Sequence, residues 1–153
     1  MTSGREVPRA LRAAYLALHR QTNACFAKDG VTADQFVLLA SLAEEDAVTQ
    51  QELVRRVGSD PNTVRAMLVL LEGRGLVVRE RHPADGRARR VSLTAKGRRV
   101  FEKLLDKSEA LRARLLAAFR PDEVTALAEL LRRVADVMAA PEGSLQPPPE
   151  VHR

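Results

Sequence analysis

The sequence predicts a mainly α-helical fold of six helices with one small β-hairpin. Three observations support this prediction. Apolar residues recur at helical spacing along most of the chain, capping residues stand where these stretches begin, and an Asp-Gly pair separates two short strand-like runs. The chain has 153 residues, 45% hydrophobic and 29% charged, which suits one ordinary domain or two small lobes that share a core.

The composition argues against several classes of protein. Aromatic residues make up only 3% of the chain, which disfavours a stacking platform for single-stranded nucleic acid. A single cysteine, Cys25, excludes an internal disulfide framework and a cysteine-rich zinc module. No apolar run approaches the roughly 18–20 residues of a membrane span, and the first residues lack the apolar core of a signal peptide. We therefore expect a soluble, cytoplasmic protein with no membrane contact, cofactor or metal site.

The positive charge is concentrated in one segment. The net charge is +5, but residues 74–99 contain nine Lys/Arg and two Asp/Glu, so they carry +7 and the other 127 residues sum to −2. A local basic patch favours a polyanionic partner such as nucleic acid. A solvated surface in an arginine-rich chain is the alternative.

Two helices are expected before residue 46. Residues 7–28 carry a mostly apolar stripe at steps of three and four, and Asp29-Gly30 ends that helix. Thr32 and Gln35 form a capping box, a pairing in which each side chain bonds the other residue's backbone N–H, and so begin the second helix.

The next two helices form a helix-turn-helix. Thr49 and Glu52 form a second capping box, and Gly58 fits the end of the short helix that follows. Ser59 or Asp60 then caps a longer helix. A short helix, a tight turn containing glycine and a longer helix make up this arrangement.

A hairpin and two further helices complete the predicted fold. Strands are expected at 76–81 and 89–93 around a turn at 82–87, so the hairpin stands beside the helix-turn-helix as a wing. Thr94 begins a long helix to about Phe119, and Pro121 begins the last one.

Polar residues on the fourth helix and basic residues on the wing predict contacts with double-stranded DNA. Asparagine can pair with adenine and arginine with guanine in the major groove, although Ser59 and Asp60 can serve as helix caps alone. Arginines alternate along the strands, so about half should face DNA and half the protein. The candidate DNA-binding residues are Gln50, Ser59, Asp60, Asn62, Thr63, Arg65, Arg79, Arg87 and Arg89.

The wing tip combines a cation with an anion. Arg87 is placed to reach a narrow, negative minor groove. Asp85 would repel phosphate, so we expect it to fix the tip, either by pairing with a wing arginine or by bonding its own turn.

The run from Thr49 to Gly97 resembles winged-helix regulators of the MarR family. The segment from Asp85 to Thr94, DGRARRVSLT, matches the family's wing, and the segment from Leu71 to Val77, LEGRGLV, matches its join of recognition helix to wing. The resemblance extends over about residues 11–139. It implies a transcriptional regulator, usually a repressor, that binds a pseudo-palindromic operator as a symmetric homodimer.

The resemblance also implies different roles for different segments of the chain. Residues 1–30 and 100–139 would form the dimerisation lobe and 31–99 the DNA-binding lobe, while the Pro-rich residues 140–153 are expected to be a disordered tail. The broad apolar faces of the flanking helices independently favour a symmetric dimer. Family members usually bind small anionic or phenolic ligands between the lobes, here near Tyr15, His19 and Phe36, although Tyr15 also fits a core position.

Two other functions remain open. The chain could be a redox-responsive regulator that senses through Cys25, but the position of this residue on an apolar stripe favours an inert thiol. It could also be a winged-helix module that binds only proteins, against which the basic wing argues. No nucleophile–base pair, metal cluster or phosphate-binding glycine loop is visible, so no enzymatic activity is expected.

Overall fold

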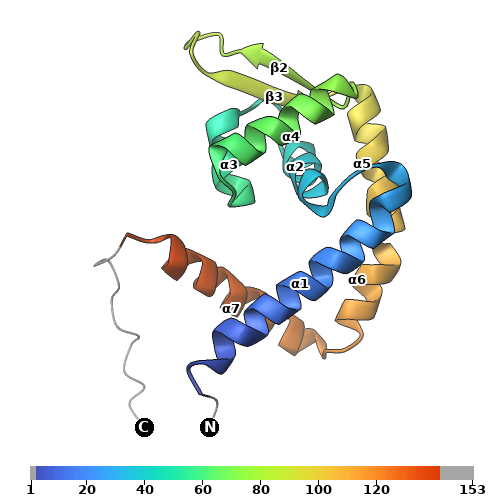
Figure 1. The fold of residues 1–153 in the computed structure, drawn as a ribbon, viewed down its shortest axis with the longest axis vertical. Helices are drawn as coiled ribbons and strands as arrows, with labels where there is room; N and C mark the ends of the chain where they lie inside the picture. Colours follow the sequence, from blue (N-terminus) through green and yellow to red (C-terminus); the bar gives the residue numbers. More distant parts are fainter. Residues whose placement is uncertain (1–2, 142–153) are drawn as a thin grey trace. The chain divides into compact units, whose positions relative to one another are not determined.

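The computed structural model describes residues 3–141 and confirms a mainly helical chain with a small antiparallel sheet (Figure 1). The chain divides into two compact units, residues 1–111 and 112–153. In chain order the elements are α1 (Glu6–Phe26), the short 3-10 helix η1 (Ala27–Asp29), α2 (Ala33–Glu44), β1 (Val48–Thr49), α3 (Gln50–Val57), α4 (Pro61–Gly73), β2 (Val77–Arg81), β3 (Arg89–Leu93), α5 (Ala95–Lys107), α6 (Glu109–Leu116) and α7 (Pro121–Ala139).

Local side-chain caps begin α2, α3, α4 and α5. The hydroxyl of Thr32 accepts the N–H of Gln35, and the Gln35 side chain accepts the N–H of Thr32, both at 3.1 Å, which confirms the first capping box. Thr49 caps α3 by accepting the N–H of Glu52 at 3.1 Å. The Glu52 carboxylate pairs with Arg55 and Arg56, so only half of the second predicted capping box is formed. Gly58 ends α3 at φ +64°, a left-handed conformation that favours glycine.

One core holds the winged helix together. It takes side chains from the end of α1, from α2, α3 and α4, from the sheet and from α5, so it fixes α4 against the wing. Its members with 0% exposure are Phe26, Leu38, Leu39, Leu42, Leu53, Val64, Leu68, Leu71, Val91 and Leu104. Burial of about ten large apolar side chains is the main source of stability in such a domain.

The sheet has three strands where the sequence predicted a two-stranded hairpin. Its order is β1–β3–β2, all antiparallel. The additional strand β1 pairs Val48 with Val91 and Thr49 with Arg90. A two-residue strand is too short to show an alternating pattern in the sequence. Its partner is β3, the second strand of the wing. The pairing ties the base of the wing to the start of α3.

The long helix expected from Thr94 to Phe119 is two helices, so the structure has one α-helix more than predicted across residues 3–141. Ser108 lies at the break, and its hydroxyl donates to the carbonyl of Leu105 at 2.9 Å. The thiol of Cys25 donates to the carbonyl of Lys107 at 3.5 Å. Side-chain bonds of this kind compete with the helical hydrogen bonds and bend or interrupt a helix.

The start of α5 lies against the root of the wing. The Thr94 hydroxyl donates to the carbonyl of Gly75 at 2.6 Å, and the Thr94 N–H donates to the carbonyl of Leu76 at 3.1 Å. A Cβ at Gly97 would lie 1.9 Å from the Leu76 carbonyl oxygen. The close approach of the two backbones therefore requires glycine at position 97.

The second unit contains α7, which begins where the sequence predicted. Pro121 occupies its first turn, and the Glu123 carboxylate accepts the N–H of Arg120 at 2.9 Å. No residue of α7 is buried. The predicted disordered tail lies, from residue 142 on, outside the described residues. Within residues 3–141, no helix has the length and apolarity to cross a bilayer.

Candidate nucleic-acid interface

One face of α4 is buried in the core and the opposite face is exposed. Asn62, Arg65 and Thr63 are all exposed near its N-terminal end, as the predicted DNA contacts require. This end of the helix is therefore free to enter a groove of a nucleic acid.

Asp60, and not Ser59, is the cap of α4. One carboxylate oxygen accepts the N–H of Thr63 at 2.9 Å and the other accepts its hydroxyl. The hydrogen bonds from the Thr63 hydroxyl and backbone hold the pKa of Asp60 below its usual range. Asp60 and Thr63 thus satisfy each other, which favours the capping interpretation for Asp60. Ser59 is half-buried in the turn between α3 and α4.

The wing tip is held by hydrogen bonds within its own turn. The Asp85 carboxylate accepts the backbone N–H of Arg87 at 3.0 Å. The backbone N–H groups of Ala84 and Asp85 donate to Nδ1 of His82 at 3.1 and 3.2 Å. Of the two expectations for Asp85, the structure shows the bond within the turn. His82 is a positioning residue that sequence reasoning missed, because its two bonds depend on the fold of the turn.

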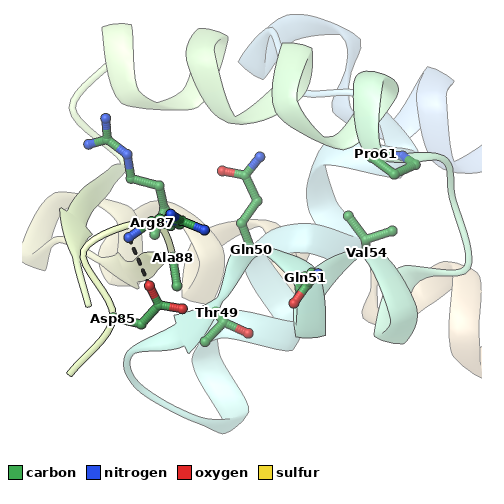
Figure 2. Close-up of a pocket in the computed structure, with 9 residues that line it drawn as sticks. Thr49, Gln50, Gln51, Val54, Pro61, Asp85, Arg87 and Ala88 are labelled. Atoms are coloured by element: carbon green, nitrogen blue, oxygen red, sulfur yellow. Dashed lines mark hydrogen bonds between the residues drawn. The ribbon is translucent and has the colours of Figure 1, made fainter. Parts of the chain in front are cut away.

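A groove of about 390 Å³ separates the wing from the helix-turn-helix. Figure 2 shows side chains from both walls facing this space. The lining residues are Thr49, Gln50, Gln51, Val54 and Pro61 on one wall, and Asp85, Arg87, Ala88 and Arg89 on the other. The groove brings together three of the predicted DNA contacts, Gln50, Arg87 and Arg89.

The strand arginines divide equally between protein and solvent, as expected, but not by strand face, because Arg79, Arg81 and Arg89 share one face and Arg90 lies on the other. Arg79 forms a two-pronged ion pair with Glu72 of α4, with N–O distances of 3.2 and 3.0 Å, and Arg90 donates to the carbonyl of Ala47 at 3.3 Å. Arg81 and Arg89 are exposed. The Arg79 guanidinium lowers the pKa of Glu72.

Arg79 is therefore like Asp60 and Thr63 among the candidate contacts, because its side chain is engaged within the protein. The ion pair joins β2 to the end of α4 and so helps to fix the wing relative to that helix. Glu72 has no predicted role from the sequence. It belongs to the segment LEGRGLV. Its partner Arg79 is seven residues later, and the two meet only because β2 runs back along α4.

The three candidate ligand residues do not share one site. Tyr15 stacks on His19 with ring centroids 5.4 Å apart, and Nδ1 of His19 lies 3.9 Å from the Asp34 carboxylate. Phe36 instead packs between Phe26 and Phe101 in the aromatic part of the core. A pocket of about 260 Å³ is lined by Tyr15, Asp34, Val37, Val57, Gly58, Ser59 and Met67.

Cys25 is half-buried, and its thiol bonds the Lys107 carbonyl. Across residues 3–141, no group of three or more His, Cys, Asp or Glu side chains is arranged to hold a metal ion.

Known proteins are similar to this chain in both sequence and fold. The family model for the MarR family matches residues 31–88. The HTH-type transcriptional repressor MdtR of Bacillus subtilis (strain 168) is 27% identical over 137 residues, which cover 90% of this chain and 88% of that protein.

Two solved structures extend the similarity. The transcriptional repressor CouR, bound to a 23-mer DNA duplex, superposes with a TM-score of 0.78 at 30% identity, covering 88% of this chain and 98% of that one. The PcaV transcriptional regulator of Streptomyces coelicolor, in complex with its natural ligand, has a TM-score of 0.72 at 30% identity and covers 88% and 93%.

Proposed function

Because the chain belongs to the MarR family of DNA-binding transcriptional regulators, we propose that it is a ligand-responsive repressor that binds a pseudo-palindromic operator as a homodimer in the cytoplasm. The observation that carries this proposal is the groove beside α4, where Gln50 faces Arg87 and Arg89. A basic groove next to an exposed polar helix end suits a nucleic-acid backbone beside its bases.

In this proposal the N-terminal end of α4 enters the major groove, which is about 12 Å wide. Asn62 and Arg65 are exposed there, and they contact base edges. Phosphates of one strand occupy the groove between α3 and the wing, held by Arg89 and Gln50. Arg87 extends from the tip toward the minor groove.

Three of the candidate residues position these contacts. Asp60 caps α4, Asp85 holds the wing turn, and Arg79 joins the wing to α4 through Glu72. Thr63 reaches DNA only if its hydroxyl leaves Asp60, and Ser59 sets the turn before the helix. These assignments divide the predicted set into residues that touch DNA and residues that orient them.

The proposed dimer rests on apolar side chains that the chain leaves exposed. On α1 these include Val7, Leu11 and Leu18, and on α7 they include Leu130 and Leu131. A second copy that covers the same faces gives a symmetric contact. The helices in residues 1–30 and 100–139 would then form the dimerisation lobe. Two copies of α4 would bind half-sites roughly 10 bp apart.

The ligand part of the proposal centres on the pocket lined by Tyr15. PcaV binds a natural ligand on the same fold. In this pocket the wall includes Gly58 and Ser59 of the turn before α4, so a bound molecule would act directly on the orientation of that helix. Asp34 is the charged lining residue, which favours a phenolic hydroxyl over a carboxylate. Tyr15 and His19 would contact the ligand, and Phe36 supports the wall from the core.

Selection from a pool of random DNA duplexes tests the proposal. The full-length protein should enrich one inverted-repeat sequence, with an affinity that falls steeply as salt rises. Light scattering should show a dimer before DNA is added. Failure to enrich any sequence, or binding that ignores salt, would favour the protein-interaction module. The wild-type protein should bind equally well with and without peroxide, and Cys25→Ser should match it, because the thiol is engaged with the Lys107 carbonyl.

A further inference from the structure

The outermost line of α4 is apolar beyond its first turn. With 3.6 residues per turn, Asn62, Ala66, Val69 and Gly73 fall within roughly 60° of one another on the face opposite the core. All four are exposed, and the Val69 side chain is 50% exposed. We call this line the outer stripe of α4.

The outer stripe has mostly short side chains. A Cβ added at Gly73 would meet nothing within 4 Å, and Ala66 has a single methyl group as its side chain. A helix with short side chains along its outermost line can approach base edges closely. Asn62 supplies the stripe's polar end, and the rest has no hydrogen-bonding side chain.

We propose that Ala66 and Val69 are specificity-determining residues that contact the C5-methyl groups of thymines in each half-site, beside the base pair contacted by Asn62. This inference rests on the proposed function. Thymine is the base that presents a methyl group in the major groove, and apolar side chains contact it favourably. A polar base edge at the same place would lose water without gaining a hydrogen bond, so it is disfavoured.

Charge identifies DNA as the occupant of this stripe. The exposed cation Arg65 lies on the same helix, and the wing arginines Arg87 and Arg89 line the adjacent groove. An apolar line flanked by arginines complements a major groove, where methyl groups lie between two rows of phosphates. A protein partner on this stripe is the competing outcome.

Leu70 provides a matched control within the same helix. Its side chain is 59% exposed, so it is as accessible as Val69. It lies about 100° from Val69 and about 40° beyond Ala66 around the helix, and therefore at the side of the outer stripe. Loss of Leu70 removes a similar apolar side chain without removing the proposed contact.

The experiment compares thymine with deoxyuridine, which lacks only the methyl group. The operator is first selected from random duplexes with the full chain. Each thymine is then replaced in both half-sites, and affinity is measured by fluorescence anisotropy for the wild type, Ala66→Ser, Val69→Ala and Leu70→Ala. Melting temperatures verify that each variant is folded, and light scattering records its oligomeric state.

For the wild type, replacement of each of one or two thymines per half-site by deoxyuridine should weaken binding about fourfold, the effect of one buried methyl group. Val69→Ala should abolish the penalty at one of these positions and Ala66→Ser should reduce it at the other. Leu70→Ala should keep the wild-type pattern at every thymine.

Three outcomes would overturn the inference. If no sequence is enriched, the proposed function fails and this inference fails with it. If an operator is found but deoxyuridine is tolerated everywhere, or its penalty persists in both stripe variants, only the methyl contact is refuted. If Val69→Ala changes the oligomeric state and not the base preference, the stripe binds protein.

Discussion

The winged helix buries many of its apolar residues, whereas α7 leaves its apolar residues exposed. In α2, α3 and α4, leucines such as Leu39, Leu53 and Leu68 have no exposed surface. In α7 no residue is buried, and Leu131 and Met138 are 44% and 76% exposed. The first region is completed by its own core, whereas the second presents a face that only another surface can cover. Stability and assembly should therefore respond to different substitutions.

Leu39→Ala should produce the largest loss of stability. Truncation of a fully buried leucine typically lowers the free energy of unfolding by about 2–5 kcal/mol, because a cavity is left. Urea unfolding followed by circular dichroism measures it. Val37→Ala, on the same helix but 47% exposed, is the control and should cost much less. Equal losses at the two positions would contradict the idea of a self-contained core.

Leu131→Glu should instead affect assembly. A charge placed on the apolar face of α7 would weaken dimerisation at least about tenfold, because it would be buried without a partner. Sedimentation equilibrium measures this, and the helical content of the monomer should be retained. Arg133→Glu, an exposed change on the same helix, is the control. A wild-type chain that is monomeric at all concentrations would refute the comparison.

Arg87→Ala tests the wing tip and should have an intermediate effect. The variant should weaken binding to every operator and reduce the salt dependence of log affinity by about one unit, since one cationic contact with DNA is lost. Anisotropy titrations between low and moderate salt measure the slope. Arg79→Ala should leave the slope nearly unchanged because its guanidinium is paired with Glu72. An unaltered slope in Arg87→Ala would exclude a contact at the tip.

The smallest expected effect is a change in pH dependence. Hydrogen bonds from Lys107 and Lys103 hold the pKa of Asp29 below its usual range. The folded state thus binds this proton less readily than the unfolded chain. The stabilisation is present above about pH 4 and is lost as the pH falls through the lowered pKa. Asp29→Asn should remove this dependence, so the stabilities of the two proteins should converge in acid. Urea unfolding at several pH values would show a constant difference if the pairs contribute nothing.

The sequence predicts best those features whose bonds stay within one turn of helix. Thr32 with Gln35, Thr49 with Glu52 and Asp60 with Thr63 each join residues three apart. A capping residue and its acceptor or donor are therefore visible in the sequence itself. The MarR family motifs likewise identify the wing before any coordinates are known.

Contacts between residues far apart in the sequence could not be predicted in this way. β1 finds its partner 43 residues later, and Phe36 finds Phe101 in α5. Arg79 and Arg81 share one strand face, and only the fold shows that Glu72 binds the Arg79 guanidinium. At the break beside Ser108, a thiol from α1 bonds the Lys107 carbonyl. Each of these outcomes depends on tertiary placement, which overrides the local pattern.

The close contact at Gly97 has a mechanical consequence. Thr94 bonds the carbonyls of Gly75 and Leu76, and Nζ of Lys96 donates to the carbonyl of Arg74 at 2.9 Å. Three consecutive backbone carbonyls between α4 and β2 are thereby fastened to the first turn of α5. Because Gly97 has no side chain, the backbones of α5 and Leu76 lie in direct contact. We therefore expect any tilt of α5 to move the root of the wing with it.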